Sequence, residues 1–246
     1  MIRSVRLPLG AVLLLPACAL VGCAGQEQSE QPGQPNGNPA SSAKTVHASS
    51  TETDTFTPED GFAPLVLNDF QVFHGKKPGP TATWTSSGGS VHCTGKPRGY
   101  LHSRKSYKNF TLRLDYRFAP SQDPAGSDQA NTGFLVYING PHRLWPVCLE
   151  VQGKHVEMGH IKANGKATVI DPAGVRDDEA ARQKARRPVG EWNSVEIVSR
   201  DGALSSFLNG TKICENKPGE LREGAIGIQS EDFEVEFRRL RIREVN

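Results

Sequence analysis

The chain has 246 residues, a formal net charge of +2, 36% hydrophobic residues, 25 glycines and 17 prolines. That length allows one substantial domain or two small ones. Loss of Arg3 and Arg6 with a predicted signal peptide would leave a net charge of zero. A neutral chain has no general attraction to nucleic acid or to an anionic membrane, so we expect no nucleic-acid partner.

The first residues have the layout of a secretory signal. Arg3 and Arg6 precede an apolar run over residues 7–21, which is short and interrupted by proline. The run leads into Leu-Val-Gly-Cys ending at Cys23, which resembles the bacterial lipobox whose cysteine is lipidated and becomes the new N-terminus. We expect residues 1–22 to be a signal peptide and Cys23 to anchor an exported lipoprotein that faces the periplasm or the cell surface. The alternative is an ordinary cleaved signal with an incidental cysteine.

Residues 23–58 are rich in Gln, Ser, Thr, Gly, Pro and Asn and hold almost no large apolar residues. Such a segment cannot bury enough surface to order itself, so it predicts a disordered tether. The folded domain is then predicted over residues 61–246, as a single sandwich-sized unit.

The predicted domain shows the two-residue periodicity of β-strands almost throughout. Residues 110–118 alternate apolar and polar side chains, and Asn209-Gly210 predicts a two-residue hairpin turn. The apolar parity switches at Arg238-Arg239, which indicates a bulge or a change of face. Further strands are expected at 134–138, 194–197, 225–229 and 235–242, and one polar surface helix at 177–187. The pattern predicts an all-β fold, a sandwich of two antiparallel sheets.

Three cysteines, Cys93, Cys148 and Cys214, remain if Cys23 is lipidated. An odd number permits at most one disulfide, and no Cys-x-x-Cys or Cys/His spacing indicates a zinc site. We therefore expect buried, apolar cysteines.

The most informative stretch is residues 147–152, where Glu150 and Gln152 alternate with apolar residues. The two side chains share one face of the predicted strand and could hold a hydroxyl-rich ligand such as a sugar. Trp145 lies just before this strand, where its ring could stack on a sugar. The alternative is an ordinary solvated strand face.

Two further groups could carry chemistry. His155 and His160 flank Glu157 and could bind a metal or move protons, although on a loop of a secreted protein such residues are more often simply solvated. Asp123 and Asp128 could supply oxygen ligands for a divalent cation such as Ca²⁺, but they match no EF-hand spacing. Phosphate-loop, dinucleotide, Gly-x-Ser-x-Gly and His-Glu-x-x-His motifs are absent from the sequence, which argues against P-loop phosphoryl transfer and Rossmann hydride transfer.

An ordered series of short motifs resembles one family of bacterial extracellular domains. The family, DUF1080, is described as 3-keto-disaccharide hydrolases or 3-keto-glycoside lyase/hydratases. The motifs are Gly61-Phe62, Tyr107-Lys108-Asn109-Phe110, Asn131-Thr132-Gly133-Phe134, Leu149-Glu150-Val151-Gln152, Gly190-Glu191-Trp192-Asn193, Leu208-Asn209-Gly210, Gly224-Ala225-Ile226-Gly227-Ile228-Gln229 and Val235-Glu236-Phe237-Arg238.

The resemblance implies a concanavalin A-like jelly-roll sandwich with a sugar-directed site on its concave sheet. It also implies cleavage of glycosides oxidised at C3, which needs a base, an enolate stabiliser and an acid for the leaving group. On this basis Glu150 is the predicted acid/base, assisted by His155 or His160. The predicted sugar or enolate contacts are Asn131, Gln152, Arg113, Arg117, Tyr137, Trp145, Gln229 and Glu231.

This sequence differs from many relatives in three places, one being the Arg that often follows the Asn-Ser-Gly strand, which is replaced near Tyr137-Ile138. Gly153-Lys154-His155 follows Gln152 where many relatives have Asp, and Ser230-Glu231 stands where many have His. The differences are compatible with altered specificity or with a binding-only member. A non-catalytic carbohydrate-binding module and a structural surface domain therefore remain as alternatives to the enzyme. We expect a monomer.

Overall fold

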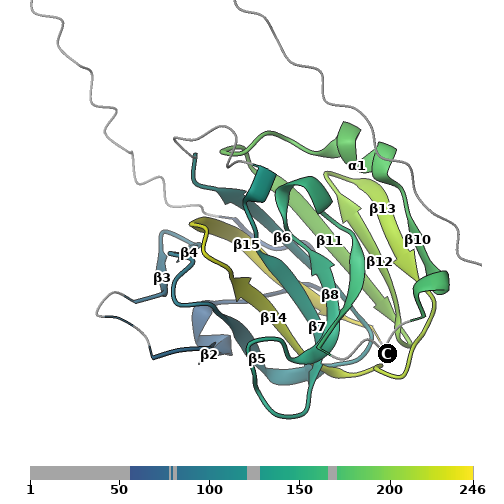
Figure 1. The fold of residues 1–246 in the computed structure, drawn as a ribbon, viewed down its shortest axis with the longest axis horizontal. Helices are drawn as coiled ribbons and strands as arrows, with labels where there is room; N and C mark the ends of the chain where they lie inside the picture. Colours follow the sequence, from purple (N-terminus) through teal and green to yellow (C-terminus); the bar gives the residue numbers. More distant parts are fainter. Residues whose placement is uncertain (1–55, 78, 80–81, 121–127, 166–170, 246) are drawn as a thin grey trace, which may run out of the picture. The chain divides into compact units, whose positions relative to one another are not determined.

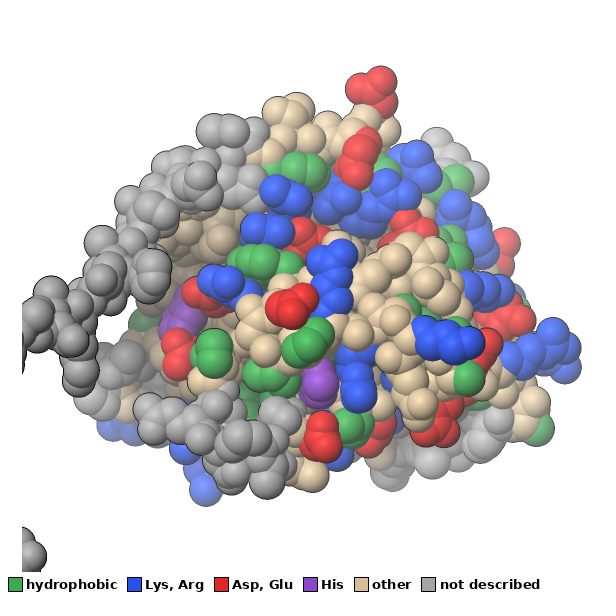
Figure 2. All heavy atoms as spheres, turned by 90° about the horizontal axis from the view of Figure 1, so that it is seen from above, with side chains coloured by type: hydrophobic (Ala, Val, Ile, Leu, Met, Phe, Trp, Pro, Cys, Tyr) green, Lys and Arg blue, Asp and Glu red, His purple; other side chains and the backbone are tan. Residues whose placement is uncertain are grey.

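The computed structural model describes residues 56–77, 79, 82–120, 128–165 and 171–245, which form two packed antiparallel sheets (Figure 1). The predicted signal peptide, Cys23 and nearly all of the predicted tether lie outside these residues. Among the described residues, no helix is long and apolar enough to cross a membrane. Basic and acidic side chains are interspersed over the face shown in Figure 2.

The larger sheet has nine strands in the order β10-β13-β12-β11-β6-β15-β4-β3, with β1 paired to β15. Its strands are β1 (Ala63–Pro64), β3 (Trp84–Ser87), β4 (Ser90–Cys93), β6 (Phe110–Phe118), β10 (Val175–Asp177), β11 (Asn193–Arg200), β12 (Ala203–Leu208), β13 (Thr211–Asn216) and β15 (Val235–Glu244).

The smaller sheet has six strands in the order β2-β5-β14-β7-β8-β9. Its strands are β2 (Phe70–His74), β5 (Gly99–Tyr107), β7 (Gly133–Asn139), β8 (Val147–Gln152), β9 (Ile161–Asn164) and β14 (Gly224–Ser230). Short 3₁₀ turns are η1 (Leu67–Asp69), η3 (His155–Glu157) and η5 (Pro172–Gly174), and the α-helix is α1 (Glu179–Ala185). The predicted all-β sandwich of two antiparallel sheets is confirmed.

The core lies between the sheets because the strands point their apolar side chains inward. On β6, Phe110, Leu112, Leu114 and Tyr116 are buried in the main cluster. Tyr116 meets Phe134 of the other sheet edge to face, with ring centroids 5.2 Å apart. Burying one such large side chain contributes roughly 1.5–3 kcal/mol, so this alternation decides which way the strand faces.

Local predictions from the turn residues are also confirmed. Asn209 and Gly210 join β12 to β13 with φ angles of 48° and 83°, the left-handed pair that a tight hairpin turn requires. The register of β15 shifts between Arg238 and Arg241, and Arg239 has a φ of 56°. The parity switch predicted at Arg238-Arg239 is therefore a β-bulge.

The helix is shorter than predicted and less exposed. Asp178 caps it by accepting a hydrogen bond of 2.8 Å from the Ala181 N–H. Arg182 is buried, and its Nε donates to the Met158 carbonyl at 2.9 Å. The predicted surface helix is present, with Glu179, Ala180, Gln183 and Lys184 exposed and one face packed beside β13 (Figure 1).

The three cysteines, Cys93, Cys148 and Cys214, are free and buried in the structure. This confirms the prediction that they are buried.

Candidate functional site

The side chains of β8 alternate between the core and the outward face of the six-stranded sheet. Leu149 and Val151 point into the core. Glu150 and Gln152 point to the outward face, as predicted, yet each is only 3% exposed. Something on that face must therefore cover them.

The connection between β7 and β8, residues 140–146, folds back over this face. His142 stacks on His102 of β5 with ring centroids 4.1 Å apart, and its Nδ1 lies 2.9 Å from the Tyr100 hydroxyl. Leu144 packs so closely on Gly75 that a Cβ there would come within 2.9 Å of its Cδ1. The connection shelters an apolar patch beside the polar side chains of β8.

Glu150 has two polar neighbours on β9. Asn164 Nδ2 donates to Glu150 Oε2 at 3.1 Å, and Lys162 Nζ lies 3.7 Å from Oε1. Burial raises the Glu150 pKa to about 7, against the lowering influence of Lys162, and the nearby Glu231 raises it further. A carboxyl group with this pKa can hold or release a proton at neutral pH.

Gln229 of β14 reaches the same place over Gly133. A Cβ on Gly133 would lie 2.0 Å from Gln229 Oε1 and 2.6 Å from Glu150 Oε1. The absence of a side chain at Gly133 is what lets the two groups converge. Gln229 is buried, and neither its Oε1 nor its Nε2 has a hydrogen-bond partner among the described residues. Its amide therefore has unused capacity for hydrogen bonds.

Asn131 and Glu231 extend this polar group towards solvent. Asn131 Nδ2 donates to Glu231 Oε2 at 2.6 Å, while the Asn131 Oδ1 has no partner among the described residues. Burial raises the Glu231 pKa, and Lys162 and Arg98 oppose that shift. Asn131 and Glu231 line a cavity of about 320 Å³ together with Arg98, Gln129, Trp145, Lys154, Asp232 and Phe233.

Comparison with known proteins identifies the family. Residues 66–243 match the model of the 3-keto-alpha-glucoside-1,2-lyase-like domain. The chain belongs to this family. Its fold resembles two crystal structures of candidate glycosyl hydrolases from Parabacteroides distasonis ATCC 8503. One is 19% identical, with a TM-score of 0.53, over 76% of this chain and 95% of that one. The other is 20% identical, with a TM-score of 0.51, over 75% and 99%.

A further neighbour of this lyase-like domain is a binding protein. The carbohydrate-binding module CBM66 from Bacillus subtilis is 12% identical, with a TM-score of 0.50, over 72% of this chain and 96% of that one. A search of the curated proteins found no match.

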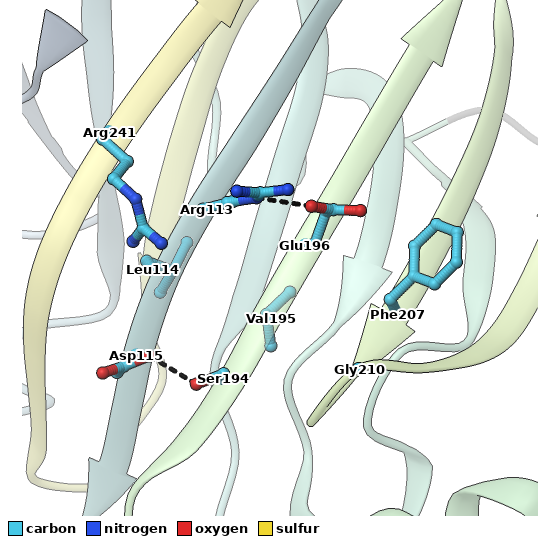
Figure 3. Close-up of a pocket in the computed structure, with 9 residues that line it drawn as sticks. All are labelled: Arg113, Leu114, Asp115, Ser194, Val195, Glu196, Phe207, Gly210 and Arg241. Atoms are coloured by element: carbon cyan, nitrogen blue, oxygen red, sulfur yellow. Dashed lines mark hydrogen bonds and ion pairs between the residues drawn. The ribbon is translucent and has the colours of Figure 1, made fainter. Parts of the chain in front are cut away.

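Two arginines predicted to stabilise an enolate lie on the wrong side of the lyase-like domain. Arg113 and Arg117 project from β6, on the outward face of the nine-stranded sheet, so they cannot meet Glu150. Arg113 Nε donates to Glu196 at 2.5 Å (Figure 3), and Arg117 Nε donates to Glu236 at 2.6 Å. The prediction failed because alternation gives the parity of a strand but not which sheet it joins.

The face shown in Figure 3 also has a cavity, of about 420 Å³, beside Arg113 and Arg241. Its charged groups already have partners, Arg113 in Glu196, Asp115 in the Ser194 hydroxyl and Arg241 in Glu59. The six-stranded sheet instead offers an unpartnered amide and a carboxyl group with a raised pKa. We therefore place the candidate site there.

The sequence prediction also places Tyr137 on the wrong side of the sheet. Its side chain lies fully buried between the sheets, where its hydroxyl bonds to Ser199 of β11. Burial raises its pKa, and it does not reach the outward face. Its φ of 60° belongs to an irregularity in β7, where the pairing with β8 shifts register between Val136 and Asn139.

The histidines do not form the predicted cluster. His155 Nε2 lies 3.2 Å from the Arg187 carbonyl, whereas His160 Nδ1 lies 3.1 Å from Asp177. Glu157, between them, pairs with Lys154 at 3.6 Å. The contacts of both histidines are with groups other than Glu150, so the structure does not bring them to it.

The remaining predicted residues are Gln152, which lies on the predicted face, and the two aspartates of the predicted cation site. Gln152 lies beside Glu150 on the outward face, but its Oε1 accepts from the Lys154 N–H at 2.9 Å, which holds it towards the backbone. Asp128 lies 3.8 Å from His155 Nδ1, and Asp123 lies outside the described residues. The cation site at these two aspartates therefore stays a prediction.

Sequence reasoning missed the two residues that contact the Glu150 carboxyl group. Lys162 and Asn164 alternate along β9, which is only four residues long. Alternation over so short a strand is a weak signal, although its position just after β8 made it the natural partner.

Proposed function

We propose that the lyase-like domain binds a 3-keto-glycoside on the outward face of the six-stranded sheet and cleaves it by elimination followed by hydration. One observation supports this most strongly. Glu150, a buried carboxyl group with a pKa of about 7, shares the space over Gly133 with the unpartnered amide of Gln229. The name of the matching family supplies the substrate class.

The proposed chemistry uses the acidity that a ketone at C3 gives to the C2 proton. A base removes that proton, its electron pair forms the C1–C2 double bond, and the C1–O bond breaks. The departing aglycone takes up a proton, and water then adds to the enone to give the keto sugar. Before the C1–O bond breaks, the electron pair left by the C2 proton is delocalised as an enolate, so negative charge collects on the C3 oxygen, which needs hydrogen-bond donors.

The residues divide naturally among these tasks. Glu150 and Glu231 are two carboxyl groups with raised pKa values, so one can accept the C2 proton while the other protonates the aglycone. Lys162 and the Gln229 amide are the donors next to Glu150. Trp145, 41% exposed, offers its ring to the apolar face of the sugar.

The experiment offers purified protein 3-keto-trehalose and a nitrophenyl 3-keto-glucoside, with the unoxidised parent sugars as controls. We expect aglycone release from the keto sugars only, and a loss of roughly 100-fold or more in Glu150→Gln. Arg117→Met, on the opposite sheet, serves as the matched control and should retain turnover. Intact keto substrates, or full activity in Glu150→Gln, would contradict the proposal.

A non-catalytic carbohydrate-binding function is the second candidate. It is favoured by the fold likeness to a carbohydrate-binding module and by the arrangement of Trp145, Asn131 and Glu231 around one cavity. Isothermal titration with unoxidised glycans tests it. Binding that survives Glu150→Ala, with no turnover of keto sugars by the unaltered protein, would favour this function over catalysis.

Export and lipid anchoring through Cys23 complete the proposed function. They rest on the signal-like segment and the Leu-Val-Gly-Cys sequence, both outside the described residues. Fractionation of cells tests the anchor, because Cys23→Ala should move the protein from the membrane fraction to the soluble fraction. Gel filtration of the soluble variant tests the expected monomer.

A further inference from the structure

Three side chains with metal-ligating atoms converge at one edge of the sandwich, away from the cavity at Asn131. His160 lies just before β9, Asp177 ends β10, and Cys214 lies opposite Asp177 on β13. One ligand atom from each lies within 4.8 Å of the other two. His160 Nδ1 and Asp177 Oδ1 are 3.1 Å apart.

We propose that His160, Asp177 and Cys214 form a Zn²⁺ site. Zinc binds thiolate, imidazole and carboxylate ligands in tetrahedral geometry at about 2.0–2.3 Å, which places neighbouring ligand atoms about 3.4–3.8 Å apart. The three ligand atoms lie within 4.8 Å of one another, which is at most about an ångström beyond that range. The soft sulfur selects zinc over calcium or magnesium.

The surroundings hold two of the ligands in place. The Ile161 N–H points at the Cys214 sulfur with an N–S distance of 3.4 Å, a contact that strengthens when the sulfur becomes a thiolate. Arg182 is fixed by its bond to the Met158 carbonyl and contacts Asp177 Oδ1. Its positive charge opposes a cation, but a carboxylate has two oxygens, so Arg182 can hold one while the metal takes the other.

Metal binding at this site must release a proton. Burial raises the Cys214 pKa to about 11, so the sulfur is a thiol before the ion arrives. Zinc replaces that proton, which passes to solvent, and apparent affinity should therefore increase with pH.

The site has an opening and a structural consequence. A cavity of about 380 Å³ touches Asp177 and Cys214, which leaves room for water as the fourth ligand. The ion would join the turn before β9, in the six-stranded sheet, to β10 and β13 of the nine-stranded sheet. Occupancy should therefore stabilise the packing of the two sheets at this edge.

The test is titration of the purified full-length protein with Zn²⁺ by calorimetry and with Co²⁺ by absorption, in the presence of a non-thiol reductant. We expect one ion per chain, a thiolate-to-cobalt charge-transfer band, and a higher thermal midpoint with zinc. His160→Gln should weaken binding by more than about 100-fold, since loss of a ligand exceeds loss of its supporting contacts. Cys214→Ser should remove the band, although the other cysteines remain.

His92→Gln is the matched control, since this half-buried histidine pairs with Glu234 elsewhere on the nine-stranded sheet. It should bind zinc as the unaltered protein does. Absence of the cobalt band in the unaltered protein, or undiminished zinc binding in His160→Gln, overturns the proposal. His160 is one-third exposed, so His160→Gln decides the question even if Cys214→Ser fails to fold.

Discussion

Lys162 Nζ lies 3.7 Å from the Glu150 carboxylate, yet the Glu150 pKa stands at about 7. Burial outweighs the lysine because the lysine is 40% exposed, where solvent screens its charge, while the carboxylate is almost fully covered. Glu150 therefore has a pKa near neutral pH, and it does not form a permanent ion pair with Lys162. A group of that kind suits acid–base chemistry and is costly to keep for stability alone.

Lys162→Met should move the ionisation of Glu150 to higher pH, because Lys162 lowers the Glu150 pKa. If ionised Glu150 is the base, the acidic limb of the kcat/KM profile follows it upward, with a loss of roughly severalfold at pH 6. Steady-state kinetics on a 3-keto-glycoside between pH 5 and 9 measures the shift. Lys105→Met, at an exposed pair with Glu244, should leave the profile unchanged. An unmoved acidic limb in Lys162→Met would assign that limb to another group.

Glu150→Gln should stabilise the protein at alkaline pH. Because the folded-state pKa is raised from 4.5 to about 7, the folded state binds the proton more tightly than the unfolded chain. Stability therefore falls as pH rises from about 4.5 to about 7, by roughly 3 kcal/mol in total, and glutamine removes that loss. Urea unfolding at pH 4.5 and pH 8 measures it. If the two proteins differ in unfolding free energy by the same amount at pH 4.5 and pH 8, the raised pKa of Glu150 is contradicted.

Gly133→Ala tests whether Glu150 and Gln229 must share the space between them. The new methyl group would overlap both side chains, so one must move, at a cost of roughly 1–3 kcal/mol in stability. Displacement of a reacting group by about 1 Å should reduce turnover about 100-fold. Gly79→Ala is the control, because a Cβ at Gly79 meets nothing within 4 Å. Full turnover in Gly133→Ala would show that the convergence is incidental.

Sequence reasoning predicted the elements of this fold better than their assembly. Periodicity found β6, the hairpin at Asn209-Gly210 and the bulge in β15, because these depend on side-chain parity and on backbone angles that neighbouring residues determine. It could not say that β6 and β8 belong to different sheets. That assignment depends on long-range pairing, which parity leaves open. For this reason Arg113 and Arg117 were placed with Glu150.

The same distinction applies to the sites. Glu150, Asn131 and Gln229 are found because they lie in motifs that resemble a family, and Glu231 because it stands where many relatives have His. The cluster of His160, Asp177 and Cys214 was missed because its members are spread over more than fifty residues and have no fixed spacing. Antiparallel pairing of β10 with β13 is what brings Asp177 to Cys214.

The N-terminal boundary provides a last test. The folded domain was predicted to begin at residue 61, yet Glu59 holds the Arg241 guanidinium with contacts of 2.5 and 2.7 Å. The same guanidinium lies over the Phe56 ring, with its central carbon 4.8 Å from the ring centre. A chain shortened to begin at Gly61 loses both contacts. We expect its thermal midpoint to fall by a few degrees, equivalent to about 1–2 kcal/mol.

Glu59→Gln separates the charge from the ring contact. Arg241 lowers the Glu59 pKa to about 2, so the ion pair stabilises the protein above about pH 4.5 and is lost as pH falls towards 2. Glu59 is largely exposed, so this contribution should stay below about 1 kcal/mol. Thermal unfolding at pH 7 should therefore rank Glu59→Gln between the unaltered and the shortened chains. A shortened chain as stable as the unaltered one would show that the domain begins at residue 61 as the sequence predicts.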